Sequence, residues 1–235
     1  MSTQTKIVVV AAVLATTLPL SLRSQSPGEF AQRSSFSILG IQTRPQGALA
    51  QNIGFGYGVS GAYQFRIDRA GILSLRVDVG VVDYGNESKR TAFSETVGDR
   101  VQVNVRTTNY IVPASIGPQI TWPTGVIRPY INAGLGGQAF FTESSVESSN
   151  AQLATTTNQS DFTPSWMLGG GVYVPLAAGK TNVQLDLGVQ YLGGGSARYL
   201  APGSIVDLPG GKVNISPMES ATHLLVIRLG ARIGL

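Results

Sequence analysis

The chain contains 235 residues, carries a net charge of +4 and has no cysteine. The lack of cysteine excludes a disulfide framework, a thiolate metal site and a lipidated N-terminal cysteine. Charged residues make up only 13% of the sequence, against about 25% in a typical soluble domain. The basic residues are mostly arginines scattered along the chain, which argues against nucleic-acid binding. Beyond residue 22 no apolar run approaches the roughly 20 residues that a membrane helix needs, so the composition favours contact with lipid through strands.

The first residues are predicted to be a secretory signal peptide. A short polar start at 1–6 carries one positive charge, and a mainly apolar stretch follows at 7–22. This order matches the n-region and h-region of a signal peptide, and the apolar stretch is too short for a comfortable membrane helix. We therefore assign 1–26 to the leader, with an end between about 20 and 26, and 27–235 to one domain exported by a bacterium with two membranes.

Eight segments after the leader alternate apolar residues with small or polar ones, the pattern of strands with two different faces. In chain order they are 35–43, 54–65, 72–84, 101–122, 129–139, 166–176, 183–191 and 222–235. In the third segment, Leu75, Val77 and Val79 alternate with Arg76 and Asp78. Across the set, aliphatic residues gather on one face, while glycines and charges share the other.

The connections between these segments alternate between short and long. Short turns are predicted around Asp68, Thr124 and Gly179, and longer connections around Gly47, Glu95, Asn150 and Pro209. The polar stretches 85–100, 143–161 and 193–220 are accordingly predicted to be loops. This is the layout of a small outer-membrane barrel, with short periplasmic turns, long outer loops and both chain ends on the periplasmic side. Because lipid cannot satisfy an open sheet edge, we predict an all-β fold, a closed antiparallel up-and-down transmembrane β-barrel of eight strands.

The final segment carries a pattern found at the end of outer-membrane barrels. Apolar residues stand at alternate positions, at Ile227, Leu229, Ala231, Ile233 and Leu235. This run resembles the C-terminal strand of bacterial outer-membrane β-barrels, with Leu235 in place of the usual aromatic ending. With its turns and faces, the chain after the leader resembles the eight-stranded OmpA-like and Opa-like outer-membrane barrels. The resemblance implies that this strand is the signal read by the barrel-assembly machinery.

Aromatic residues lie near the ends of the predicted strands. Such rings gather at membrane interfaces because they are apolar and, for Tyr and Trp, carry one polar group. The predicted girdle comprises Tyr63, Phe65 and Trp122 near the periplasmic ends, and Phe55, Tyr110, Phe141, Trp166 and Tyr191 near the outer ends. Aromatic residues are common in any strand, but their gathering near strand ends favours the girdle.

Charged residues on the inward face form a predicted lumen network. Its members are Arg76, Asp78, Asp186, Arg228 and Arg232. Unpaired charges in a closed lumen are costly, so we expect Asp186 to pair with Arg228 or Arg232 on the neighbouring strand. A gated ion path and a structural plug both fit such a network. Because eight strands leave an interior filled by side chains, we favour the plug.

Two motifs have a possible reading as enzyme or cofactor sites. The glycines of 56–61 match a dinucleotide fingerprint letter for letter, but they lie within a predicted strand and no helix is predicted after it, so we interpret them as small inward residues. His223 is the single histidine, and a lipid-A deacylase would need a serine two positions later, where Leu225 stands. No catalytic residue, cofactor or metal is therefore predicted.

The sequence thus predicts a non-enzymatic integral protein of the cell outer membrane, with a structural role and surface loops that contact partners as in an adhesin. Its expected surroundings are outer-membrane lipid and lipopolysaccharide, the barrel-assembly machinery and an unidentified surface partner, and we expect a monomer. Two alternatives stay open. One is a lipid-A-modifying enzyme, and the other is a soluble lipocalin-like barrel that carries an apolar ligand inside. The lipocalin is disfavoured because its water-facing strand faces would need more lysine and glutamate than this chain places there.

Overall fold

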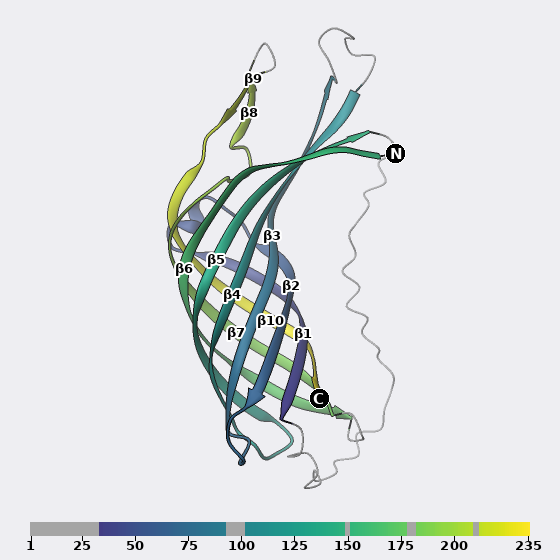
Figure 1. Ribbon diagram of the computed structural model, residues 1–235. Helices are drawn as coiled ribbons and strands as arrows, with labels where there is room; N and C mark the ends of the chain where they lie inside the picture. Colours follow the sequence, from purple (N-terminus) through teal and green to yellow (C-terminus); the bar gives the residue numbers. More distant parts are fainter. Residues whose placement is uncertain (1–32, 93–101, 149–150, 178–181, 209–211) are drawn as a thin grey trace.

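The structure is a computed structural model that describes residues 33–92, 102–148, 151–177, 182–208 and 212–235. Within these residues eight long strands form one closed antiparallel barrel (Figure 1), which confirms the predicted fold class. The barrel strands are β1 (Ser34–Gln46), β2 (Gly56–Arg66), β3 (Leu73–Ala92), β4 (Gln102–Thr121), β5 (Arg128–Ser148), β6 (Ala151–Ala177), β7 (Val183–Tyr199) and β10 (Met218–Gly234). The predicted leader, 1–26, lies outside the described residues.

The barrel strands follow one another around the wall in chain order, and β1 closes the barrel against β10. In that seam Phe36 lies opposite Ile233, and Gln46 lies opposite His223. The connection between β7 and β10 contains a separate hairpin of β8 (Ile205–Leu208) and β9 (Lys212–Ile215). In the described part of the chain, no helix is long and apolar enough to cross a bilayer. Closure removes the free strand edges that would leave backbone groups unpaired.

The barrel wall carries its apolar residues on the outside. On β10, Ile227 and Leu229 are 50% and 53% exposed, while Val226 and Arg228 are buried. On β5, Ile131 is likewise 62% exposed. Successive side chains of a strand point to opposite faces. The predicted aliphatic faces therefore form the outer surface, and the faces with glycines and charges form the lumen.

The two ends of the barrel differ. At the end where β1 begins and β10 stops, called the lower end here, short turns join β2 to β3 and β4 to β5 (Figure 1). Asp68 caps the first turn, because its carboxylate accepts hydrogen bonds from the backbone of Ile72 and Leu73 at 3.1 and 3.0 Å. Gly71 turns the chain at a φ of +74°, a left-handed conformation that favours glycine. The predicted turn around Gly179 lies outside the described residues.

At the opposite, upper end, β3 to β6 continue beyond the rim while still paired with one another (Figure 1). The prediction of loops at 85–100 and 143–161 is therefore wrong where the chain is described, since β3 runs to Ala92 and Ser148 lies opposite Ala151. The prediction relied on an apolar face, which strands outside lipid do not need. Their pairing is maintained by backbone hydrogen bonds and polar cross-strand contacts, such as the 2.9 Å contact between Thr107 and Ser144.

The predicted loop 193–220 is also partly strand, and it folds over the upper mouth. β7 continues to Tyr199, and Leu200 just after it is buried. Tyr84 donates a hydrogen bond to the Leu200 carbonyl at 3.1 Å, and Asn52 donates one to the Tyr199 hydroxyl at 2.8 Å. Consecutive glycines at the start of the stretch interrupt the alternation and concealed the strand.

The lumen has a mainly apolar upper layer, with a few buried polar side chains such as Gln138 and Thr142, and a polar lower layer. Leu49 of the short helical turn η2 (Leu49–Gln51) is fully buried in the upper layer. That layer includes Leu49, Ile53, Val82, Tyr84, Ile111, Phe140, Leu192, Tyr199, Leu224 and Val226. The Phe140 ring lies 6.4 Å from that of Tyr84 and 5.7 Å from that of Tyr199, centroid to centroid. Burial of these apolar side chains stabilises the barrel from within and leaves the lower half of the lumen to polar groups.

Candidate functional site

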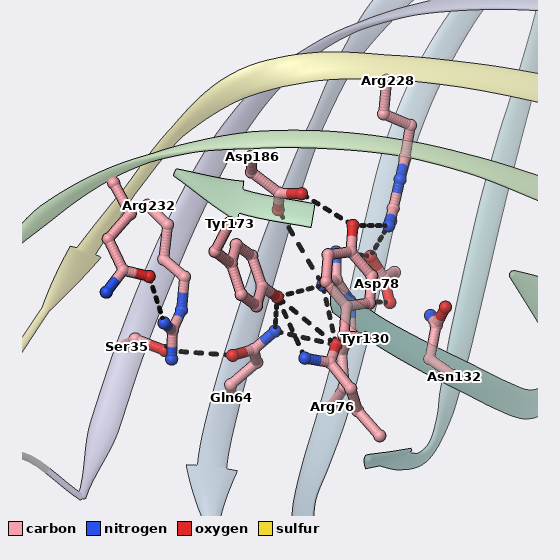
Figure 2. A network of polar contacts seen from close by, with 12 residues as sticks. Ser35, Gln64, Arg76, Asp78, Tyr130, Asn132, Tyr173, Asp186, Arg228 and Arg232 are labelled. Atoms are coloured by element: carbon pink, nitrogen blue, oxygen red, sulfur yellow. Dashed lines mark hydrogen bonds and ion pairs between the residues drawn. The ribbon is translucent and has the colours of Figure 1, made fainter. Parts of the chain in front are cut away.

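The lower lumen contains a buried network of arginine, aspartate, tyrosine and glutamine side chains (Figure 2). The structure places all the predicted inward charges there, on strands β3, β7 and β10. Their exposed fractions are 1% for Arg76, 9% for Asp78, 0% for Asp186, 2% for Arg228 and 8% for Arg232. The parity of each strand dictates this direction, because residues two apart share a face. The charges therefore belong to the interior of the barrel and not to its surface.

Asp78 is the centre of the network. Its carboxylate accepts hydrogen bonds from Nε and Nη2 of Arg76, each at 2.8 Å. Arg228 donates a third from Nη1 at 3.0 Å, reaching across the lumen from β10 (Figure 2). Arg76 also places its Nη1 4.0 Å from Oδ2 of Asp186 on β7. A bidentate contact and a shared carboxylate make Asp78 a strong cross-link between facing parts of the wall.

The predicted pairing of Asp186 with Arg228 or Arg232 is wrong. Asp186 lies opposite Gly230 in the ladder between β7 and β10, two residue pairs away from each arginine. Its Oδ1 accepts a hydrogen bond from the Tyr130 hydroxyl at 2.7 Å. Its Oδ2 has no hydrogen-bond partner among the described residues. The prediction failed because a tyrosine from β5 occupies the space toward which the carboxylate points.

Tyr130, which the strand pattern places inward without indicating a role, links the charged groups. Its hydroxyl donates to Asp186 and accepts a hydrogen bond from Nη2 of Arg228 at 2.9 Å. Gly171 and Gly188 on β6 and β7 make room for it, since a Cβ at either position would stand 2.6 Å from the hydroxyl oxygen. Inward glycines on two adjacent strands, here β6 and β7, leave space in the lumen. They are thus the sequence signal for a large inward side chain, here Tyr130 of β5, that extends over both positions.

A second tyrosine, Tyr173 of β6, organises a layer of amide side chains. Its ring stacks on that of Tyr130 with centroids 4.5 Å apart. Its hydroxyl accepts hydrogen bonds from Gln64, from Arg76 at 3.1 Å and from Gln119 at 3.0 Å. Amides both donate and accept hydrogen bonds. They therefore satisfy the buried hydroxyl and guanidinium without adding charge to the lumen.

Arg232 lies at the lower edge of the network and contacts uncharged groups. Its Nε donates to the Ser35 hydroxyl at 3.0 Å, and its Nη1 donates to the amide oxygen of Gln184 at 2.7 Å. Its guanidinium carbon lies 4.5 Å from the centroid of the Tyr173 ring, a cation–π contact. Arg232 therefore joins the network through an aromatic ring and neutral oxygens.

Two small cavities adjoin the network. One of about 30 Å³ lies between the polar and apolar layers, where its lining includes Ser60, Asp78, Met167, Gln190 and Arg228. Another of about 10 Å³ lies at the lower mouth. A cavity needs about 10–15 Å³ to hold one water molecule, so these spaces suit isolated waters. No group of three or more His, Asp or Glu side chains in the described residues is arranged to hold a metal ion.

The predicted girdle residues include several large exposed rings on the outer surface. Near the lower end, Tyr63, Phe65 and Trp122 are 43%, 44% and 66% exposed. Toward the upper end, Phe55 and Trp166 are 55% and 48% exposed. The rings therefore stand at two heights on the wall, separated by the aliphatic band.

The remaining girdle residues form contacts between neighbouring strands. Tyr110 lies opposite Phe141 in the ladder between β4 and β5. The ring centroids of Trp166 and Tyr191 on β6 and β7 lie 5.6 Å apart, and His223 of β10 stacks on Tyr191 at 6.0 Å. His223 thus belongs to an aromatic cluster on the upper outer wall.

The glycines of 56–61 lie within β2, whose next element is the strand β3. Gly58 is required there by close approach of the neighbouring strand, because a Cβ would stand 1.9 Å from the backbone oxygen of Val81. The stretch has therefore neither the turn nor the following helix that a dinucleotide fingerprint needs.

The predicted assembly residues lie on the outer face of β10. Ile227, Leu229 and Leu235 are 50%, 53% and 64% exposed. Ala231 is also exposed, and Ile233 is partly exposed. Because β10 pairs with β1 to close the barrel, this apolar row runs along the closing seam.

Comparison with known proteins gives a likeness of fold. No protein-family model and no curated protein matches the chain. Among solved structures, Neisserial surface protein A overlaps with a TM-score of 0.43 at 15% identity, over 86% of this chain and 97% of that one. Ail, the attachment invasion locus protein of Yersinia pestis, gives 0.38 at 16% identity over 86% and 98%. A major outer membrane protein of Thermus thermophilus gives 0.36 at 14% identity over 85% and 98%. At these TM-scores the overlaps carry no functional information.

Proposed function

We propose that this chain is a non-enzymatic integral protein of the outer membrane, a barrel whose upper strands and loops contact partners outside the cell. The observation that carries the proposal is the outer surface of the barrel. Aliphatic side chains stand exposed around the wall, among them Ile38 at 61%, Ile131 at 62%, Leu135 at 72% and Leu168 at 58%. Soluble proteins rarely expose apolar area on this scale, whereas the wall of a transmembrane barrel requires it.

The backbone and the aromatic rings support the same location. A closed barrel pairs the backbone groups along its wall, the condition that a bilayer imposes on a spanning sheet. Exposed rings at two heights suit the two membrane interfaces. Short turns at the lower end and long paired strands at the upper end match a barrel with its lower end in the periplasm.

The interior supports a barrier in preference to a pore. The apolar upper layer and the charged lower network fill the lumen, with cavities of about 10 and 30 Å³. Interiors of eight-stranded barrels are just wide enough for side chains to fill. Asp78 forms ion pairs with Arg76 on its own strand and with Arg228 on β10. These contacts link different parts of the wall inside the lumen, in the path that an ion would take through the barrel.

The strands above the rim supply the surface role. They stay paired in water and carry polar contacts such as the 3.1 Å hydrogen bond from Arg106 to Asn86. An adhesion-like contact with a surface partner is the role that such exposed polar strands suit. In this proposal, lipid and lipopolysaccharide surround the wall, the assembly machinery recognises β10, and the barrel works as a monomer without a cofactor.

Membrane fractionation tests the location. Outer membranes from cells that express the chain are washed with carbonate, and the pellet is run on SDS gels with and without boiling. We expect the protein to stay in the pellet and to change its migration only on boiling, because the closed ladder resists SDS. Release by carbonate combined with identical migration in both samples would overturn the proposal.

Planar-bilayer recordings test the barrier separately. The refolded barrel should give no steady current, because the apolar layer and the arginine–aspartate network occupy the lumen of the described barrel. Steady currents that change in the Asp78→Ala variant would replace the barrier with a pore whose gate is the arginine cluster.

A further inference from the structure

The two described turns at the lower end of the barrel carry exposed aliphatic side chains. In the turn between β2 and β3, Ile67 is 59% exposed, and Ile72 is exposed as well. In the turn between β4 and β5, Val126 and Ile127 are 58% and 57% exposed, beyond the exposed ring of Trp122. Tight turns are built mostly from Gly, Pro, Asn, Asp and Ser. The geometry of these turns therefore does not account for their aliphatic residues.

The two turns lie side by side and are held by hydrogen bonds (Figure 1). The backbone N–H of Thr121 donates to the Ile72 carbonyl at 2.8 Å, which joins the end of β4 to the first turn. Across the second turn, the N–H of Trp122 donates to the Pro129 carbonyl at 2.8 Å, and the Asp68 carboxylate caps the first turn. The exposed aliphatic side chains thus stand on a fixed backbone. They are called the lower patch here and comprise Ile67, Ile72, Val126 and Ile127.

The lower patch continues the apolar outer wall of the barrel. On β2 the outward row passes through the exposed ring of Phe65 and reaches Ile67 in the turn. On β4 the outward row passes through Ile120 and reaches Trp122, where the second turn begins. Residues two apart on a strand share a face, so each row leads from the wall into its turn without a polar residue between. Whatever meets the lower wall therefore also reaches the patch.

We propose that the lower patch lies in the headgroup layer of the inner leaflet, so that the partner of the two turns is a lipid surface. The inference rests on the proposed function, because the patch meets lipid only if the wall does. Amphipathic elements bury their apolar face at this boundary and keep polar groups in water. Arg69, exposed at the tip of the first turn, suits the same layer, since a long cationic side chain extends to the headgroups while its neighbours stay in a less polar place.

A periplasmic protein is the other occupant that an exposed apolar patch can have. A stable protein interface uses about 20–30 residues on each side, which is more than these two short turns present. A lipid surface needs no minimum area of this kind, because the wall already holds the barrel in the bilayer. The size of the patch and its continuity with the wall therefore favour lipid.

Spin labelling in nanodiscs tests the inference. Val126→Cys and Ile127→Cys each give one site for a nitroxide, since the chain has no cysteine of its own. The barrel is placed in nanodiscs of phosphatidylcholine and phosphatidylglycerol, whose two faces are open to solvent, and the accessibility of the label to oxygen is divided by its accessibility to a water-soluble nickel chelate. Val189→Cys on the wall is the lipid reference, and Ser216→Cys on the exposed upper connection is the water reference. We expect the lower-patch labels to give a ratio between those of the two references, because oxygen concentrates in lipid and the chelate in water.

A label at Thr124→Cys, an exposed position in the second turn, tests whether the patch itself sets this depth. Replacing Val126 and Ile127 with serine should lower the ratio at this label toward the value at Ser216→Cys. Ile215→Ser, the same kind of change at a residue 40% exposed on the upper connection, should leave the ratio unchanged. If the chain with both serines fails to fold, as judged by heat-dependent migration, Ile67→Ser in the neighbouring turn replaces it.

Lower-patch labels with the ratio of the Ser216→Cys label would overturn the inference, and so would a Thr124→Cys label that does not respond to the serine changes. Protection of Val126→Cys from an impermeant maleimide in cells but not in nanodiscs would identify a periplasmic protein as the partner and overturn it as well. A Val189→Cys label in lipid beside a lower patch in water overturns this inference alone. A Val189→Cys label as accessible to the chelate as the Ser216→Cys label overturns the proposed function.

Discussion

Replacing Asp78 with alanine is expected to be the most damaging single change in the lower lumen. The substitution removes hydrogen bonds of 2.8, 2.8 and 3.0 Å to Arg76 and Arg228. These arginines are 1% and 2% exposed, so bulk water has little access to them once the carboxylate is lost. Removing one partner of a buried ion pair costs about 3–5 kcal/mol. We expect the free energy of unfolding to fall by an amount in that range.

The same change at Asp186 is expected to cost less. Asp186 accepts one hydrogen bond, from Tyr130, and its ion-pair contact with Arg76 is longer, at 4.0 Å. Asp186→Ala leaves a buried hydroxyl without its acceptor, a loss of about 1–3 kcal/mol, while Arg76 keeps Asp78 as its partner. Both aspartates are buried, so the order of the two losses tests the hydrogen-bond geometry and not burial.

Urea unfolding of the refolded chain in lipid vesicles measures these losses through the fluorescence of its two tryptophans. A double-mutant cycle between Asp78 and Arg228 should give a coupling of about 0.5–3 kcal/mol. A parallel cycle between Asp186 and Arg232 should give a smaller one. If Asp186→Ala costs more than Asp78→Ala, or if the second cycle shows the larger coupling, the arrangement in Figure 2 is refuted.

Three further changes test other parts of the barrel. Gly188→Ala places a Cβ 2.6 Å from the Tyr130 hydroxyl and should cost about 1–3 kcal/mol as overpacking. In urea unfolding the same change should cost less in a Tyr130→Phe chain than in the wild type, and equal costs in the two backgrounds would mean that the hydroxyl is not what clashes. Leu229→Lys places a charge on the outer face of β10, which should lower the free energy of unfolding by about 2–4 kcal/mol if that face meets lipid and reduce the amount of protein in the outer membrane on immunoblots. Normal stability and a normal amount of protein would show that this face does not meet lipid. Tyr84→Phe removes the 3.1 Å hydrogen bond to the Leu200 carbonyl, which contributes about 0.5–1.5 kcal/mol, so proteolysis near Leu200 should become faster. An unchanged rate of cleavage would mean that this hydrogen bond does not hold the segment in place.

The barrel wall was predictable because its signals are local. Alternation with a period of two needs only a few residues to show which face is apolar. The predicted segment 183–191 lies within β7, and 222–235 covers most of β10, the strand that starts at Met218. The turn at Asp68 was likewise visible, since Asp and Gly supply the cap and the left-handed conformation that a tight turn needs.

The strands above the rim were not predictable by the same method. Around Thr107 and Ser144 both faces of the strands carry mainly polar residues, so no apolar face marks the strands. Their pairing depends on the backbone and on hydrogen bonds between residues distant in sequence. The polar composition therefore predicted a loop. Each strand continues there because it stays paired with the adjacent strands of the sheet.

The partners in the lumen were only half predictable. Strand parity correctly directs Asp186 and Arg232 inward, but parity does not say which side chain lies across the lumen. That choice depends on the register of several strands and on the glycines that allow Tyr130 to reach past β6 and β7.

Site-specific labelling tests the central claim that the aliphatic wall faces lipid. The chain has no cysteine, so each introduced one is a unique probe. Val189→Cys and Ile227→Cys report on the wall, where the native side chains are 46% and 50% exposed, and Ser216→Cys reports on the exposed upper connection. In proteoliposomes with the upper end outward, Ser216→Cys should react quickly with a membrane-impermeant maleimide, while the two wall variants should react only after denaturation. Wall cysteines that react as fast as Ser216→Cys in the intact vesicles would contradict the claim.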